Sequence, residues 1–330
     1  MSVVKLAPVF KDYLWGGTRL RDEFNKKCEL EKVAESWELA CHKQGSSTVA
    51  SGKNKGLSLE ELIRLDKSVL GTSCSESDTF PLLIKLIDAK DDLSVQVHPD
   101  DEYALKVEGE PGKTEMWYVI DCDDDASLIY GFKDELSKEQ FAQMIENGSL
   151  LDAVNKVKVH KGDVFFIPSG TLHAIGKGIL IAEIQENSNT TYRVYDYGRV
   201  GADGKPRELH IEKAVEVTDT KPIKLRERYE TIKADGCSFR LLEHCGYFSS
   251  AVFDVSQEVE LCIDKRSFAH ILFIEGSAKI ASDEVLDAQK GDSFFIAAGT
   301  QSVRISGRCS FILTRNGFEE GFDRLVKEKP

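Results

Sequence analysis

The segment Lys161-Gly-Asp-Val-Phe-Phe-Ile-Pro-Ser-Gly-Thr171 occurs a second time in the chain, as Lys290-Gly-Asp-Ser-Phe-Phe-Ile-Ala-Ala-Gly-Thr300. Eight of the eleven positions are identical, and the two copies are offset by 129 residues throughout. Each copy places β-forming apolar residues between a Gly-Asp pair and a glycine, which is typical of a strand between two turns. This self-similarity indicates that the chain contains two copies of one β-rich unit.

Short apolar segments bounded by turn residues surround both copies, and helix signals are few. Capping boxes predict helices after Ser58 and Ser137, and Pro99 favours a short helix toward Glu108. So many strands with so few helices favour a β-sandwich or barrel over alternating βαβ units. The predicted strands span residues 82–88, 93–98, 114–120, 127–131, 163–167, 179–185, 190–197, 249–255, 269–274, 293–296 and 309–314.

Length and composition argue against a nucleic-acid-binding protein and against a membrane-spanning protein. A chain of 330 residues suits two domains, and 41% hydrophobic with 30% charged residues is typical of a globular protein. The net charge of -13 gives no basic field for nucleic acid, and no apolar run is long enough for a membrane helix. Without a signal peptide, and with eight scattered cysteines, a reducing, cytoplasmic location is expected.

Three separated segments carry residues that can bind a metal. In a strand, Gln96 shares a face with His98, and Glu115 shares one with Lys113 and Trp117. The first copy of the repeat continues into His173, whereas the second has Ser302 at that place, so one site is expected. Two imidazoles, a carboxylate and an amide oxygen suit zinc or another divalent first-row metal, with room for a water or substrate.

The spacing Gly162-x5-Pro168-x-Gly170-x2-His173 resembles the second cupin motif, although Lys177 stands where that motif has an asparagine. Further segments resemble the short bacterial form of class I mannose-6-phosphate isomerases, in matching order through roughly two thirds of the chain. These segments are YLWGG (13–17), AESWELA (34–40), QVHPDDEYA (96–104), GKTEMWY (112–118) and the whole of 161–199.

The resemblance implies a mainly β fold of two cupin units, each a jelly-roll barrel or sandwich, with a few helices added to the first. Residues 1–200 would form the catalytic cupin domain, with an N-terminal extension and a helical insertion near 134–156. Residues 201–235 would connect it to a degenerate C-terminal cupin domain at 236–330.

The resemblance also implies one zinc ion per chain, held by residues matching Gln96, His98, Glu115 and His173. Arg193, in the YRVYDYGR segment, takes the position of the family's catalytic arginine, and Lys113 matches a lysine of the longer forms. The activity implied is the interconversion of mannose 6-phosphate and fructose 6-phosphate through an enediol. The partner would therefore be a small sugar phosphate, with no nucleic acid or membrane partner. A homodimer is a candidate assembly.

Other polar residues are candidates for substrate contacts and proton transfer. Lys90, Trp15 and Glu183 are predicted to bind the substrate, whereas Lys85 and Arg199 are each better interpreted as solvated surface charges. The catalytic base is left open between a metal-bound water and three carboxylates, which are Glu38, Glu183 and Glu186.

Two other functions fit the same residues. Two histidines and one carboxylate also form the open triad of iron-dependent cupin oxygenases. A non-enzymatic sugar-phosphate-binding cupin would use the same pocket without turnover. Oxygen consumption would indicate the first, and stabilisation by the ligand without conversion the second.

Overall fold

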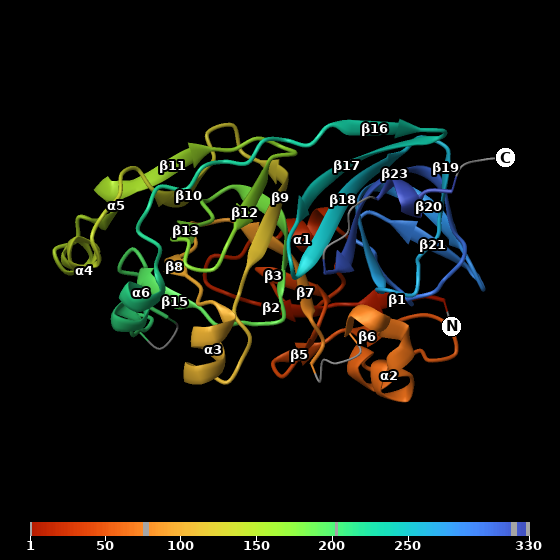
Figure 1. Ribbon diagram of the computed structural model, residues 1–330, viewed down its shortest axis with the longest axis horizontal. Coiled ribbons are helices and arrows are strands. Elements are labelled where there is room, and N and C mark those ends of the chain that lie inside the picture. Colours follow the sequence, from red (N-terminus) through yellow and green to blue (C-terminus); the bar gives the residue numbers. More distant parts are fainter. Residues whose placement is uncertain (1, 75–78, 202–203, 318–321, 328–330) are drawn as a thin grey trace.

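The computed structural model describes residues 2–74, 79–201, 204–317 and 322–327, and it contains two β units side by side (Figure 1). The first unit carries the yellow and green strands of the figure, and the second carries the cyan and blue ones. All named strand pairs are antiparallel, so the expected mainly β architecture of two units is confirmed.

The first unit consists of two facing sheets. The order of the first sheet is β12-β9-β14-β7-β3-β2, and that of the second is β11-β10-β13-β8-β15. The first sheet comprises β12 (Val164–Ile167), β9 (Glu115–Cys122), β14 (Ile179–Glu186), β7 (Leu82–Ala89), β3 (Glu35–Leu39) and β2 (Val9–Lys11). The second comprises β11 (Val154–Lys158), β10 (Ser127–Phe132), β13 (His173–Ala174), β8 (Val95–Val97) and β15 (Tyr192–Tyr195), and β4 (Cys41–His42) pairs separately with β5 (Gly45–Ser46).

The second unit is one continuous sheet with the order β16-β17-β18-β23-β20-β22-β1-β6, to which β19 and β21 add at β23 and β20. Its strands are β16 (Thr231–Ala234), β17 (Cys237–His244), β18 (Phe248–Val255), β19 (Glu258–Leu261), β20 (Ala269–Ala281), β21 (Val285–Gln289), β22 (Ser293–Ile296) and β23 (Val303–Asn316). The remaining two are β1 (Val3–Ala7) and β6 (Thr48–Val49). The first strand of the chain therefore pairs in the sheet of the second unit, through β22. The sequence analysis had placed it in an extension of the first unit, and the domain boundaries stay a prediction.

The helices of the described segments are short. Both predicted capping boxes are present, at Ser58 and Ser137, and Asp100 caps the helix expected after Pro99. The helices are α1 (Arg19–Glu23), α2 (Leu59–Leu65), α3 (Asp101–Val107), α4 (Lys138–Glu146), α5 (Leu150–Ala153) and α6 (Ile211–Val217), with 3-10 turns at Lys67–Leu70, Thr72–Cys74 and Asp323–Leu325. Helices α3, α4, α5 and α6 lie beside the first unit, as expected, whereas α2 lies beside β6 of the second unit's sheet (Figure 1). No helix of these segments is long and apolar enough to cross a membrane.

A shared apolar core joins the two units. Strands β7, β9 and β14 are buried on both faces, because their outer residues pack against the second unit. On β14, Leu180 and Ile184 belong to this shared core, whereas Ile179 and Ile181 point into the first barrel. The outer faces of these strands are thus stabilised by apolar packing. The inner faces of the same strands can therefore carry polar groups.

The repeated Phe-Phe pair performs the same task in both copies. Phe165 and Phe294 each point into their own barrel, whereas Phe166 and Phe295 both enter the shared core. This alternation follows from the two-residue period of a strand. Inside the second barrel, Phe253, Phe273 and Phe311 pack ring against ring, so aromatic side chains fill that interior.

We expect Phe295→Ala to lower the free energy of unfolding by about 3–5 kcal/mol, because it opens a cavity in the shared core. Val285→Ala, at a position 63% exposed on the same unit, should change it by less than about 0.5 kcal/mol. Urea unfolding of both variants measures the difference. Similar losses in the two variants would contradict the shared core as a source of stability.

Candidate metal centre and substrate cavity

The five-stranded sheet aligns three polar side chains in one row. Gln96, on β8, lies directly opposite His173 of β13 and also opposite Arg193 of β15. Residues directly opposite each other in antiparallel strands share a face and lie within reach of one another. Segments nearly a hundred residues apart are therefore brought together by the strand register.

The six-stranded sheet supplies a second polar row that faces the first. Trp117 of β9 is opposite Glu183 of β14, which is in turn opposite Lys85 of β7. Glu115 lies two residues before Trp117 and therefore on the same face. The expected common face of Glu115 and Trp117 is confirmed.

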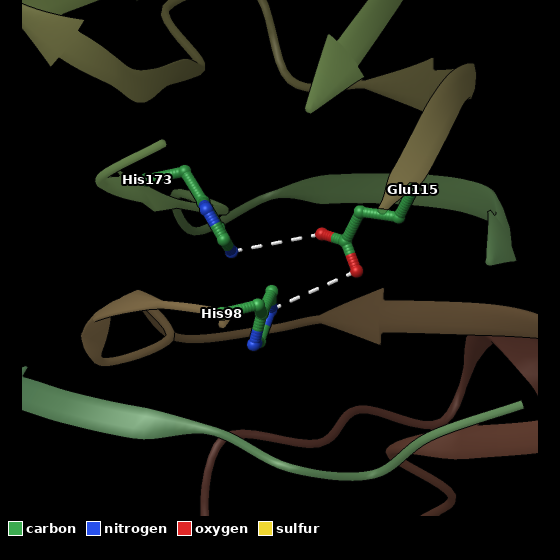
Figure 2. A group of neighbouring side chains, drawn as sticks. All are labelled: His98, Glu115 and His173. Carbon is green, nitrogen blue, oxygen red and sulfur yellow. Dashed lines mark ion pairs between the residues drawn. The ribbon is translucent and has the colours of Figure 1, made fainter. Parts of the chain in front are cut away.

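Three side chains from the two sheets point at one another (Figure 2). Glu115 Oε2 lies 3.7 Å from His98 Nε2, and its Oε1 lies 3.6 Å from His173 Nε2. One ligand atom from each residue lies within 4.8 Å of the others, and all three residues are buried. Gln96 lies beside this set. Its amide nitrogen is 3.4 Å from His173 Nε2, and a half-turn of the amide would present its oxygen instead.

Both histidines are held as metal ligands usually are. The Nδ1 atom of His98 lies 2.9 Å from the carbonyl oxygen of Thr190, and that of His173 lies 2.8 Å from the carbonyl oxygen of Thr171. A carbonyl only accepts, so Nδ1 carries the hydrogen and Nε2 presents its lone pair to the cluster. Burial keeps both rings neutral, because it lowers the pKa of His173 to about 4 and that of His98 well below its usual value.

Glu115 is 0% exposed, and its Oε1 accepts no hydrogen bond. Burial and the nearby Glu183 raise the pKa of Glu115 to about 7. Lys113 Nζ forms an ion pair with it at 2.8 Å and also lies 3.1 Å from His98 Nε2. A buried carboxylate facing two neutral imidazole nitrogens is a donor set that fits a divalent cation.

Lys85 is buried, so its interpretation as a solvated surface charge is wrong. Its Nζ lies 2.9 Å from Glu183 Oε1 and 3.9 Å from Glu35 Oε2. Burial alone would lower the pKa of Lys85, but the two carboxylates outweigh burial and raise it. Burial also opposes ionisation of Glu183, yet Lys113 and Lys85 outweigh it and lower its pKa to about 2.

A cavity of about 250 Å³ opens between the two rows. Trp15, Gln96, Lys113, Glu183 and Arg193 all line it. Lys90 is exposed at the end of β7 and is not among the lining residues, so its placement does not support a substrate contact. Lys85 lies in the cavity wall instead.

The cavity also contains residues that the sequence analysis missed. Arg207, from the segment interpreted as a polar connection, lines the cavity and bonds Asp196 through Nε at 2.8 Å. Arg199 is half-buried and bonds the same carboxylate, so it is not a freely solvated charge. The sequence carries no local signal for Arg207, because a polar stretch with glycines is typical of a surface loop. Tyr13, Glu35 and Asn189 are further lining residues.

Two of the three carboxylates considered as bases point away from this cavity. Glu38 forms a buried ion pair with Lys26 at 2.6 Å, next to the second unit. Glu186 accepts a hydrogen bond from the backbone nitrogen of Thr114 at 2.6 Å and is not a lining residue. Glu183 is the one of the three whose side chain lines the cavity.

Comparison with known proteins places this arrangement in a family. Residues 3–118 match the model of the phosphomannose isomerase type I catalytic domain, and residues 239–316 match that of the mannose-6-phosphate isomerase cupin domain. A mannose-6-phosphate isomerase of Bacillus subtilis is 42% identical over 309 residues, 93% of this chain and 96% of that one. The chain belongs to the type I phosphomannose isomerase family.

Other members agree with this assignment to the type I phosphomannose isomerases. The mannose-6-phosphate isomerase of Streptococcus mutans is 39% identical, over 92% of this chain and 95% of its own. The crystal structure of the Bacillus subtilis mannose 6-phosphate isomerase superimposes with a TM-score of 0.90 at 41% identity, and covers 95% of this chain and 99% of that one. The two-unit cupin fold of this chain is thus that of a solved family member.

We expect His98→Ala to weaken zinc binding by more than about 100-fold, because even residues behind the ligands change metal affinity by 10–100-fold. His160→Ala, whose ring is 69% exposed beside a surface turn, is the matched control and should bind zinc like the unmodified protein. Calorimetric titration of each variant with zinc gives the affinities. Equal affinities for the two variants would remove His98 from the ligand set.

We expect Lys85→Met to lower the free energy of unfolding by about 3–5 kcal/mol, since it leaves Glu183 buried without its nearest cation. Adding Glu183→Gln should restore part of the loss. The exposed pair Lys279–Asp287 is the control, where Lys279→Met should cost less than about 1 kcal/mol. A full double-mutant cycle measures the coupling free energy between Lys85 and Glu183. Additive losses of stability in the double variant would contradict a stabilising ion pair between them.

Proposed function

We propose that this protein is a zinc-dependent isomerase that interconverts mannose 6-phosphate and fructose 6-phosphate, with one zinc ion per chain. Family membership supports the reaction and the phosphorylated sugar as substrate. The observation that carries the zinc proposal is the buried Glu115, whose oxygens face the Nε2 atoms of His98 and His173 and whose Oε1 accepts no hydrogen bond.

The reaction moves a proton between two adjacent carbons of the sugar, next to a carbonyl. Zinc bound by His98, Glu115, His173 and the oxygen of Gln96 would supply Lewis-acid polarisation of the sugar oxygens at carbons one and two. The remaining steps belong to side chains of the cavity, which must orient the sugar, hold its phosphate and exchange the proton.

Arg193 is proposed to stabilise negative charge on the substrate. It lies opposite Gln96 in the sheet, and its buried Nε has no hydrogen-bond partner. Its Nη1 donates to the carbonyl oxygen of Glu208 at 2.8 Å, which holds the guanidinium in place. A fixed guanidinium with a spare donor suits the developing enediolate charge or the phosphate.

Lys113 and Glu183 are proposed to handle the proton. Lys113 is the ammonium closest to the ligand atoms, so a bound cation would take over its role as counter-charge of Glu115 and release it toward the cavity. Glu183 bonds Lys85 and Trp117, and its oxygens keep further lone pairs for the substrate. Trp15, 4% exposed, forms an apolar wall beside them.

We also propose that the protein is located in the cytoplasm. None of the eight cysteines forms a disulfide, which fits a reducing, cytoplasmic setting. Whether two copies associate stays a prediction of the sequence analysis.

The assay that tests the function couples fructose 6-phosphate formation from mannose 6-phosphate to a measured product. We expect turnover that a chelator abolishes and that zinc restores. Oxygen consumption without isomerisation would instead indicate the iron-dependent oxygenase. Thermal stabilisation by mannose 6-phosphate without turnover would indicate a binding protein, and either result would contradict the proposal.

We expect Arg193→Ala to lower kcat by at least about 100-fold while zinc stoichiometry stays at one per chain, because the guanidinium stabilises charge that develops during the reaction. Arg64→Ala, 70% exposed on α2, is the control with unchanged kcat. Steady-state kinetics with metal analysis of both variants gives the comparison. A near-normal kcat in Arg193→Ala would contradict the proposed role.

A further inference from the structure

The glycine of the repeated Lys-Gly-Asp turn accepts hydrogen bonds from cations in both copies. The carbonyl oxygen of Gly291 accepts from Lys26 Nζ. The carbonyl oxygen of Gly162 accepts from Arg228 Nη2 at 2.9 Å and from Arg240 Nη2 at 3.2 Å. The two glycines have φ values of +90° and +88°, so the same left-handed turn presents the same carbonyl at the junction of the two units.

The two junctions differ in their charge balance. At Gly291 the cation is neutralised, because Glu38 Oε1 lies 2.6 Å from Lys26 Nζ. At Gly162, neither Arg228 nor Arg240 forms an ion pair with any carboxylate of the described segments. Arg228 is exposed, whereas Arg240 is only 7% exposed. Burial together with Arg228 lowers the pKa of Arg240, and Tyr118, Asp254 and Asp163 oppose that shift. One copy of the repeat therefore has a direct ion pair that the other lacks.

A cavity of about 170 Å³ lies at the junction that lacks a direct ion pair, between β12, β17 and the segment 225–228. Two of its carboxylates already have partners, since Glu243 pairs with Arg226 at 2.6 Å and Asp163 accepts from the backbone nitrogen of His160 at 2.8 Å. The third, Glu227, is on the exposed segment. This cavity shares no lining residue with the substrate cavity.

We propose that this cavity is a second anion site, which binds a small oxyanion of the phosphate class between Arg228 and Arg240. A bound oxyanion would be the counter-ion of Arg228 and Arg240, as Glu38 is the counter-ion of Lys26 at the other junction. Guanidinium groups suit it because their planar donor forks match phosphate oxygens. The volume of the cavity suits a small ligand, because 170 Å³ is below the roughly 300–1,000 Å³ of pockets that enclose drug-sized ligands.

Binding of inorganic phosphate is tested by thermal unfolding of the full chain in sodium phosphate against sodium chloride of equal ionic strength. All proteins carry Arg193→Ala, which weakens phosphate binding in the substrate cavity. Adding Arg228→Gln should weaken the apparent phosphate affinity by about tenfold, because one charge-assisted donor is lost. Adding Arg64→Gln, an exposed arginine of α2, should not change it. Equal phosphate responses in the two double variants would overturn the proposal.

A charge reversal at the same position gives a second test. Arg228→Glu supplies Arg240 with the carboxylate that Lys26 already has, so it should raise the Tm in chloride and abolish the added effect of phosphate. A lower Tm in chloride together with an unchanged phosphate response would overturn the site.

The source of the phosphate group is distinguished by repeating the titration with fructose 6-phosphate. If fructose 6-phosphate and inorganic phosphate half-saturate the protein at the same concentration, the site recognises the phosphate group alone. If fructose 6-phosphate half-saturates it at a lower concentration, the site recognises a sugar phosphate. Both results support the site when they depend on Arg228, and a response to either ligand that ignores Arg228 contradicts it. None of these readouts requires isomerase activity, so failure of the proposed function would leave the test intact.

Discussion

A fully buried carboxylate is the constraint on which the first unit depends. Glu115 is fully enclosed, and a charge in such a place is strongly unfavourable unless it is compensated. Its surroundings are arranged for a positive charge, because two neutral imidazole nitrogens and the Lys113 ammonium converge on its oxygens. An apolar residue at this position would stabilise a purely structural core more, so a buried cluster of ionisable groups of this kind marks a candidate functional site.

The two-unit architecture explains how the fold tolerates this polar interior. The strands that carry Glu115, Lys85 and Glu183 bury their opposite faces in the apolar core shared with the second unit. The second copy of the repeat has Ser302 where the first has His173, and phenylalanine rings fill its barrel. It thus packs behind the sheet that carries Glu115, while the His98, Glu115 and His173 cluster belongs to the first unit alone among the described residues.

Sequence periodicity predicted the strand faces and the two repeated units, because both depend on local sequence patterns. The alternation of strand residues placed Glu115 and Trp117 on one face, and the repeat identified two units before any contact was known. Lys85 was misread as a solvated charge because its partner Glu183 lies 98 residues away and neither residue signals the other locally. The pairing of β1 with the second unit and the entry of Arg207 into the cavity likewise depend on long-range register and chain path, which local patterns do not encode.

The central claim is that one cation sits between His98, Glu115 and His173. Anomalous X-ray scattering from crystals of the zinc-loaded protein, recorded on both sides of the zinc absorption edge, tests it most directly. The account predicts one peak per chain, about 2.0–2.2 Å from the Nε2 atoms of both histidines and from an oxygen of Glu115. A peak elsewhere, or a fully active crystal with no peak at this position, would contradict it.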